Sequence, residues 1–303
     1  MPEGTARVCL VISTFRSDDA VLKILASLAD LGDDLFFLTI VVDSLGSGKI
    51  PAEVAARGYR NVRYENRDRN LGSAGNLAER LRLAGETGAE FAYAINHDGV
   101  VDPTIVRKLL EVAQRQRQVG AVYPLRRMTT HGGRYDLTGK TALPLPFLGV
   151  AKPPSEPLTE VHWSSSNGAL YNLDPIRAGL VPRDELWLGF EDMAFGWLLR
   201  ENGYKQFIVS DAIVEDNYEF RRRGGVRVSD KPPWYAYYFA RNFILVTQGK
   251  NRPASVKATA AARIALELGM ITALRPQKLL RYKLFAQGLV DGLRGKTGKG
   301  PLP

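Results

Sequence analysis

The chain has 303 residues, 45% of them hydrophobic, with 41 Lys or Arg against 32 Asp or Glu and a formal net charge of +9. This length and apolar content can bury a substantial core and exclude a disordered or low-complexity protein. The single cysteine, Cys9, lies in an apolar run, so we expect no disulfide framework, a reducing cytoplasmic compartment and no secretory signal. No stretch is long and apolar enough to predict a membrane-spanning helix.

Strand and helix patterns alternate through the first part of the chain. Buried strands are predicted at 7–14, 35–43, 61–66 and 90–96, and helices at 18–32, from Ser73 onward and at 102–118. Asp102 as an N-cap, followed by Pro103, is a strong helix start. This alternation predicts an α/β fold whose mostly parallel sheet is flanked by helices, with ligands beyond the carboxyl ends of the strands.

The last part of the chain is basic and helical. Residues 221–303 hold 17 Lys or Arg and three Asp or Glu. Helices are predicted at 254–274 and 276–296, the second with Leu279, Leu280, Leu284 and Leu289 among basic residues. Such a helix fits a membrane surface. Packing of its apolar face against the rest of the chain is at least as good an explanation.

Several enzyme classes lack their sequence signals. No Gly-x-Gly-x-x-Gly follows the first strand and there is no Gly-Lys-Ser/Thr loop, which disfavours dinucleotide dehydrogenases and P-loop enzymes. Three histidines and one cysteine give little support to a catalytic triad or a zinc site. Polar residues instead end three predicted strands, at 14–16, 43–44 and 96–98. Carboxylate and nucleotide chemistry therefore remains.

Seven stretches of the sequence, in chain order, resemble a known family. They are VCLVISTFR, IVVDSLGSG, NRDRNLGSAGN, AINHDG, SSNGALYN, GFEDMAFGWLLRENGY and YYFARN. Together they resemble family 2 glycosyltransferases of the GT-A fold, in particular the rhamnosyltransferase and galactofuranosyltransferase branch. The resemblance implies a Rossmann-like catalytic domain at 1–250, with a basic helical extension at 251–303. The pair Arg241-Asn242 recurs in this branch, but the residues alone indicate no role for it.

The implied activity is hexosyl transfer with inversion. The donor would be a UDP- or dTDP-linked sugar, and the acceptor a hydroxyl of a glycan or lipid-linked glycan, as in cell-wall or polysaccharide biosynthesis. Mg²⁺ or Mn²⁺ is the implied cofactor, because a diphosphate leaving group needs its developing charge neutralised. Peripheral contact with the inner face of a membrane is a further expectation, and nucleic acid is not an expected partner.

The nucleotide site is carried over by the motifs. The implied residues are Thr14, Phe15, Arg16, Asp43, Asn70, Gly72, Asn76 and Asn96. Asp43 resembles the aspartate that accepts a hydrogen bond from the nucleobase. Gly72 would permit close approach of the backbone to the nucleoside. The other explanation of this loop is a helix N-terminus with Ser73 as its cap, and both can hold.

The metal and catalytic residues also follow from the resemblance. Asp98 is similar to the second aspartate of the Asp-x-Asp motif, whose first aspartate is here Asn96, and Asp216 stands where the family has a metal-binding histidine. Glu191 and Asp192 match the Glu-Asp motif, with Asp192 as general base. Their other explanation is stabilisation of a helix start by its dipole. The donor and acceptor contacts would come from Trp163, Asn167, Gly168 and Trp187.

Two other classes stay open. A nucleotidyltransferase also uses strand-end carboxylates and a metal, but it normally shows a Gly-rich, basic signature after its first strand, which the segment STFRSDD lacks. A non-catalytic module that binds a nucleotide sugar or nucleic acid would explain Asn96 and the basic C-terminal part. Sugar transfer or sugar-nucleotide hydrolysis distinguishes an enzyme from a binding module.

Overall fold

The computed structural model describes residues 6–31, 35–143, 149–216, 220–223, 226–229, 231–249 and 252–301. The strands are β1 (Val8–Thr14), β2 (Leu38–Ser44), β3 (Val62–Arg67), β4 (Phe91–Asn96), β5 (Val119–Met128), β6 (Arg134–Asp136), β7 (Gly149–Val150), β8 (Leu158–Glu160), β9 (Ala169–Asn172), β10 (Lys205–Asp216), β11 (Phe220–Arg223) and β12 (Val226–Ser229). The helices are α1 (Asp18–Leu31), α2 (Lys49–Arg57), α3 (Gly72–Gly85), α4 (Pro103–Arg115), α5 (Asp174–Arg177), α6 (Glu191–Glu201), α7 (Tyr235–Thr247), α8 (Ala254–Leu274) and α9 (Lys278–Leu293).

One mixed sheet organises the fold. Its strand order is β3-β2-β1-β4-β9-β5-β10-β8, with β6 and β7 attached beside β5, while β11 and β12 pair separately. The pairs β1–β2, β1–β4, β2–β3 and β5–β10 are parallel. β9 runs antiparallel to both of its neighbours, and β8 runs antiparallel to β10. The predicted α/β fold with a mostly parallel sheet flanked by helices is confirmed.

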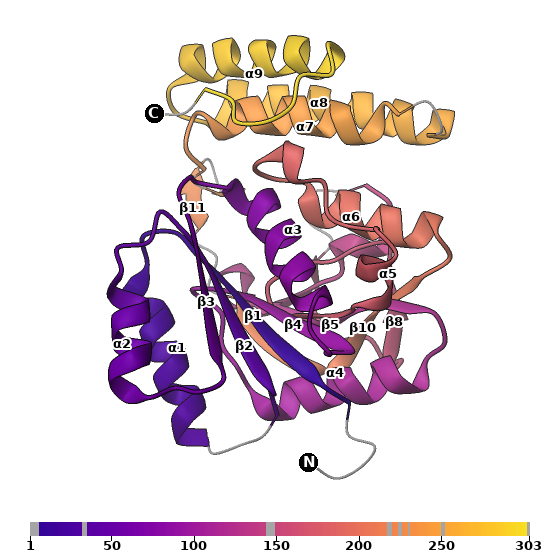
Figure 1. Ribbon diagram of the computed structural model, residues 1–303. Coiled ribbons are helices and arrows are strands. Elements are labelled where there is room, and N and C mark those ends of the chain that lie inside the picture. The colour runs from indigo at the N-terminus through magenta and orange to yellow at the C-terminus, as the bar shows by residue number, and fades with distance from the viewer. Residues whose placement is uncertain are drawn as a thin grey trace.

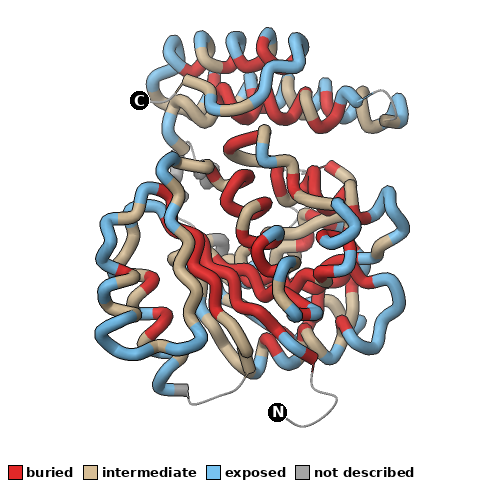
Figure 2. Tube along the Cα trace, in the orientation of Figure 1, coloured by how far each residue is buried: buried red, intermediate tan, exposed pale blue. Residues whose placement is uncertain are grey.

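Helices cover both faces of this sheet (Figures 1 and 2). Apolar residues of α1, α2 and α4 pack on one face, and those of α3, α5 and α6 pack on the other. All seven residues of β1 are buried, as expected for a parallel strand between two helical layers. Side chains of a strand alternate between the faces, so neighbouring residues at a strand end enter different surroundings.

The first half of the chain follows the predicted pattern. The four predicted strands are β1 to β4, and the Asp102 side chain caps α4 by accepting from the backbone N–H groups of Thr104 and Ile105 at 2.8 and 3.4 Å. The helix α2 and the strands from β5 onward were not predicted. α2 is short, and its N-cap residue, Gly48, makes no side-chain cap hydrogen bond, so the sequence lacks a clear start signal there. Gly32, the predicted end of the first helix, lies outside the described residues.

Three C-terminal helices form a further layer beyond α3 and α6 (Figure 1). α8 has the predicted bounds, and α9 lies inside the predicted range 276–296. α7 packs against both of them, although it precedes the boundary placed at residue 250. That domain division stays a prediction.

None of the described helices combines the length and the apolar character needed to cross a membrane.

Candidate active site

Polar side chains gather where β1 and β2 end side by side. Thr14 and Asp43 are partners in the parallel ladder, and both are buried. The Tyr64 hydroxyl donates to Asp43 Oδ2 at 2.9 Å. Thr14 Oγ1 and Asp43 Oδ1 have no hydrogen-bond partner among the described residues. Each buried unsatisfied polar atom costs about 1–3 kcal/mol, so this pair suits a ligand that donates hydrogen bonds.

Burial raises the pKa of Asp43, and the negative charge of Asp18 raises it further, whereas the hydrogen bond from Tyr64 lowers it. A donor from a ligand would act as Tyr64 does and favour the charged carboxylate. Phe15 and Arg16 follow at the exposed rim, with the guanidinium of Arg16 5.2 Å from the centre of the Phe15 ring. Four of the residues predicted to bind the nucleotide, Thr14, Phe15, Arg16 and Asp43, therefore lie together at the ends of β1 and β2.

The loop before α3 is held by its own amides. Asn70 Oδ1 accepts from the backbone N–H of Gly72 at 2.9 Å, and Asn76 Nδ2 donates to Ser44 Oγ at 3.2 Å. The hydroxyl of Ser73 is buried and has no partner among the described residues. The side chain that accepts from a backbone N–H at the start of α3 is therefore that of Asn70 and not that of Ser73. The Ser44 hydroxyl also accepts from the backbone N–H of Leu71 at 3.4 Å, so it joins both the loop and α3 to the end of β2.

Gly72 has a different neighbour from the one expected. Its φ is +68°, and a Cβ there would lie 2.0 Å from the carbonyl oxygen of Trp187. Trp187 is 8% exposed, stacks on Tyr238 with ring centres 5.2 Å apart, and donates through Nε1 to the Asn70 carbonyl at 3.3 Å. The absent side chain of Gly72 thus makes room for protein, and the ring of Trp187 is largely occupied by packing.

The end of β4 faces α3. Asn96 Oδ1 accepts from the hydroxyl of Ser13 at 3.1 Å and from Nη2 of Arg80 at 3.4 Å. The Asn96 backbone N–H donates to Asn167 Oδ1 at 3.0 Å. Asn96, which occupies the first position of the Asp-x-Asp motif, is therefore hydrogen-bonded on both its side chain and its backbone.

Arg80 is a fully buried cation that the sequence analysis missed. It projects from α3 and donates to Ser13 Oγ at 3.2 Å and to the carbonyl of Ile95. Burial lowers the pKa of Arg80 to about 10, while Tyr171 and the carboxylates of Asp192 and Glu191 act in the opposite direction. The signal was an arginine among the apolar positions of a predicted helix. Arg80 places positive charge beneath the strand ends and near the Glu-Asp pair.

Glu191 and Asp192 are the first two residues of α6. Their contacts extend beyond what N-terminal capping of this helix would require. The backbone N–H of Ser166 donates to Asp192 Oδ1 at 3.2 Å, so a distant segment holds this carboxylate. Glu191 is buried, and its Oε2 has no partner among the described residues. Burial and the neighbouring Glu191 raise the pKa of Asp192 to about 7, against the lowering effects of Ser166 and Arg126. A carboxylate with this pKa can exchange a proton near neutral pH.

Asp216, the predicted metal ligand on β10, is already paired. Arg126 Nε donates to Asp216 Oδ2 at 3.2 Å, and Nη2 donates to the same oxygen. Arg126 Nη1 donates to the Asn167 carbonyl at 3.4 Å. Arg126, for which the sequence holds no local signal, therefore connects Asp216 to Asn167. Its positive charge also acts on Asp192.

The fit of a divalent metal rests on Asp98. This residue is exposed in the turn after β4. The described residues contain no group of three or more His, Cys, Asp or Glu that could hold a metal. Mg²⁺ commonly takes one or two protein carboxylates and completes its shell with substrate phosphates and water, so Asp98 fits that requirement. Asp216 would have to release Arg126 before it could bind the metal.

The predicted donor and acceptor residues divide into two groups. Asn167 and Gly168 lie at the site, where Gly168 has φ +88° and its backbone N–H donates to the Ala94 carbonyl at 2.7 Å. Trp163 is half-buried and donates through Nε1 to the carbonyls of Thr141 and Ala142, each at 3.2 Å. Its N–H is therefore used within the protein.

Arg241 and Asn242 have a structural role that the sequence could not indicate. Both are fully buried on α7. Asn242 Nδ2 lies 2.9, 2.7 and 3.1 Å from the carbonyl oxygens of Leu186, Leu188 and Gly189. Arg241 Nη2 donates to the Leu186 carbonyl at 2.8 Å. The pair holds the loop that leads directly into α6 and its carboxylates.

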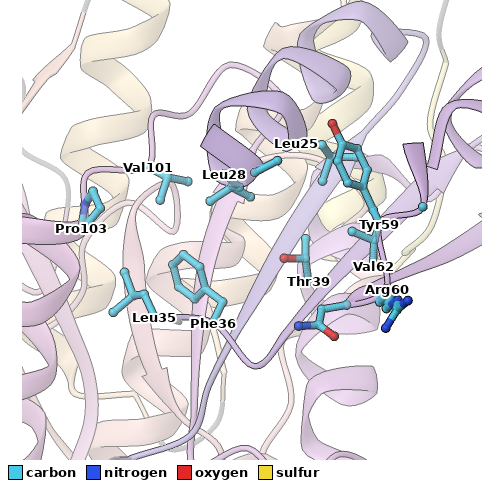
Figure 3. Close-up of a pocket in the computed structure, with 13 residues that line it drawn as sticks. Leu25, Leu28, Leu35, Phe36, Thr39, Tyr59, Arg60, Val62, Val101 and Pro103 are labelled. Carbon is cyan, nitrogen blue, oxygen red and sulfur yellow. The ribbon is translucent and has the colours of Figure 1, made fainter. Parts of the chain in front are cut away.

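A separate pocket lies at the opposite edge of the sheet (Figure 3). Its volume is about 290 Å³, and its lining includes Leu25 and Leu28 of α1 with Phe36, Tyr59 and Val62 near the amino ends of β2 and β3. None of the predicted site residues lines it. Ligands of open α/β sheets bind at the carboxyl ends of the strands, so this pocket is not the candidate active site.

Comparison with known proteins identifies the family of this chain. Residues 9–165 match the profile of glycosyl transferase family 2. The chain belongs to glycosyl transferase family 2. Members of this family transfer sugars, which favours a glycosyltransferase over the nucleotidyltransferase and the binding module. No curated protein matches the sequence.

Solved structures similar to this family 2 chain are glycosyltransferases. Residues 1–349 of S. aureus TarS superpose with a TM-score of 0.62 at 12% identity, covering 94% of this chain and 80% of that one. The mannosyltransferase PcManGT from Pyrobaculum calidifontis, solved with GDP-Man and Mn²⁺, gives 0.59 at 14% identity and covers 97% and 89%. The same TarS fragment with UDP-GlcNAc gives 0.56 at 13% identity, covering 96% and 92%. At these identities the likeness establishes the GT-A fold.

Proposed function

We propose that this glycosyltransferase moves a sugar, with inversion, from a UDP- or dTDP-linked donor to a hydroxyl of a glycan or lipid-linked glycan. The observation that carries the proposal is the position of Asp192 at the start of α6, where the Ser166 N–H holds one carboxylate oxygen, and burial and Glu191 raise its pKa toward the range of a general base at neutral pH. A hydroxyl needs such a base, because its own proton must leave as the new bond forms. A lipid-linked acceptor would bring the enzyme to the cytoplasmic face of a membrane.

The reaction we propose is a single displacement. The acceptor oxygen forms a bond to the anomeric carbon while the bond from that carbon to the diphosphate breaks. The hydroxyl proton passes to Asp192, and the electron pair leaves with the nucleoside diphosphate. Glu191 keeps the pKa of Asp192 raised, and the N–H of Ser166 fixes the position of one carboxylate oxygen.

The donor would lie along the carboxyl edge of the sheet. Asp43 Oδ1 would accept from the N3–H of a pyrimidine, which satisfies an atom that now has no partner among the described residues. Asp98 would hold Mg²⁺ or Mn²⁺, which would supply positive charge to the diphosphate when bound. The neutral amide of Asn96, held by Arg80, would contribute hydrogen bonding but no negative charge.

Two variants with opposite effects test the proposal. Asp192→Asn should bind UDP or dTDP like the wild type but transfer sugar at least about a hundredfold more slowly, because general base catalysis contributes about 10²- to 10⁴-fold. Asp43→Ala should weaken nucleotide binding by about 1.5–3 kcal/mol, the contribution of a hydrogen bond to a charged group. Calorimetry with each nucleotide and a transfer assay over a panel of nucleotide sugars measure both effects.

Two outcomes would contradict these assignments. Unchanged turnover by Asp192→Asn would move the base elsewhere, with Glu191 as the next residue to substitute. Unchanged nucleotide affinity of Asp43→Ala would remove Asp43 from the base pocket.

A further inference from the structure

The outer face of α9 is an exposed stripe of mostly apolar side chains. Positions 279, 283, 286, 290 and 293 recur at helical spacing, and all five are exposed. Leu279 is 86% exposed and Leu293 is 74% exposed, which is unusual for leucine in a folded layer. Figure 2 shows this helix at the edge of the molecule with exposed positions along its outer side.

The opposite face of α9 is already used. Phe285, Gly288 and Gly292 are buried against α7, and a Cβ on Gly288 would lie 2.4 Å from the Tyr237 carbonyl oxygen. Core packing therefore accounts for one face of the helix and leaves the stripe of Leu279 to Leu293 without a partner in the described chain. Packing and surface contact, which the sequence left open as alternatives, apply to different faces.

The charges around this stripe have one sign. Lys278, Lys283, Arg294 and Lys299 are exposed. The only acidic residue from 278 to 303 is Asp291, which is buried and bound to the Tyr237 hydroxyl at 2.8 Å and to Lys296 at 3.2 Å. This surface thus combines exposed leucines with exposed lysine and arginine side chains, and α9 contributes no exposed carboxylate to it.

The neighbouring helix α8 has a related polarity. Arg263 and Glu267 are turned inward, with side chains 13% and 11% exposed, and pair with each other at 3.2 Å. The exposed positions of α8 are uncharged and include Leu266 and Leu268. A helix that faces water normally places its charged residues outward. The arrangement suits an apolar neighbour outside the helical layer.

We propose that the outer face of α9 binds an anionic lipid bilayer. Exposed leucines would enter the boundary between headgroups and acyl chains, and the cations beside them would meet acidic headgroups, as in interfacial amphipathic helices. A second copy of the chain fits this face less well, because it would bring two sets of lysines and arginines together. The membrane contact itself is inferred without the proposed function. Only its role, which is to hold the enzyme beside a lipid-linked acceptor, rests on that function.

Vesicle sedimentation with the full chain tests the inference without donor or acceptor. The wild type should sediment with vesicles of mixed phosphatidylcholine and phosphatidylglycerol, less so at high salt, and not with phosphatidylcholine alone. The double variant Leu279→Glu/Leu293→Glu should lose at least about tenfold in vesicle affinity. The control Gln114→Glu/Gln116→Glu makes the same change in net charge at exposed positions in the last turn and at the C-cap of α4, and should bind like the wild type.

Circular dichroism and thermal unfolding establish that each variant is folded. The inference is wrong if the wild type ignores anionic vesicles, or if Leu279→Glu/Leu293→Glu binds them equally well. It is also wrong if light scattering detects a dimer that this double variant abolishes, since the face would then belong to a second copy. Transfer activity that persists after any of these results would leave the proposed function intact.

Discussion

Single residues at the site are defined by partners that lie far away in the sequence. Arg126 and Asp216 are 90 positions apart, yet they form an ion pair whose side chains are 12% and 15% exposed. Their neighbours Arg127 and Glu215 form a second pair at 3.3 Å in which both side chains are well exposed. The alternation of side chains along β5 and β10 therefore places one ion pair at the site and the other in solvent.

Arg126→Gln should shift the pH profile of turnover. A nearby cation lowers the pKa of a carboxylate, so removal of Arg126 should raise the already elevated pKa of Asp192. Because the base works when deprotonated, the acidic limb of kcat against pH should move to higher pH, and the loss should be larger below neutrality. Broken pairing with Asp216 should also lower the free energy of unfolding by up to about 3 kcal/mol.

Two variants isolate the effect of this charge. Arg126→Lys keeps the positive charge and should restore the position of the acidic limb, and Arg127→Gln should leave it unchanged. A loss of turnover by Arg126→Gln that is the same at every pH would show that Arg126 does not act on Asp192.

At the scale of elements, close packing of α7 and α9 depends on two glycines. A Cβ on Gly288 would lie 2.4 Å from the carbonyl oxygen of Tyr237, and one on Gly292 would lie 2.8 Å from that of Arg241. At Gly269 of α8, by contrast, such a Cβ meets no atom within 4 Å from the described residues outside its own helical turn. The same residue type thus has opposite consequences in two helices of one layer.

Gly288→Ala should destabilise the protein and Gly269→Ala should stabilise it. The added methyl group at 288 must push the helices apart, at a cost of about 1–3 kcal/mol. At 269 it meets open space, and the higher helix propensity of alanine contributes up to about 1 kcal/mol. Thermal unfolding of both variants measures the two signs, and a stabilised Gly288→Ala would show that α7 and α9 are less tightly packed than the distances indicate.

At the scale of the whole molecule, the helical layer and the sheet domain are joined through the loop before α6. Asn242 of α7 reaches the carbonyls of Leu186, Leu188 and Gly189. The segment after α9 returns to the same region, where Gly298 donates to the Glu185 carbonyl at 2.6 Å. The layer therefore supports the segment that carries Glu191 and Asp192.

Asn242→Leu should lower both stability and turnover. The substitution removes the Asn242 donor to the partly buried carbonyls of Leu188 and Gly189, at a cost of about 1–3 kcal/mol, while Leu186 keeps its donor from Arg241. It also frees the loop that positions Asp192. Small displacements of a catalytic group can cost up to about a hundredfold in rate, so kcat should fall by about tenfold or more. Thr247→Val is the control, because its hydroxyl bonds only to the Phe243 carbonyl within α7 in the described chain. Loss of stability with unchanged kcat would limit Asn242 to packing.

Local patterns in the sequence were sufficient for the parts of this protein that short segments specify. Apolar runs predicted β1, β2 and β4, and the Asp102-Pro103 pair predicted the start of α4, because these signals depend on residues next to one another. The polar residues Thr14, Asp43 and Asn96 at strand ends were predicted to lie along one edge of the sheet, because the carboxyl ends of parallel strands lie side by side. Ordered motifs predicted the family before any contact was known.

Only the tertiary structure decided which of these groups meet. Arg80 reaches Ser13 and Asn96 across 67 and 16 positions, and Ser166 reaches Asp192 across 26, so no local pattern could indicate these contacts. Helical periodicity likewise defines the faces of α9 but cannot say which one is buried, because that depends on what α7 presents to it. The charge state of a carboxylate and the exposure of a leucine are both set by neighbours that folding, and not sequence proximity, brings close.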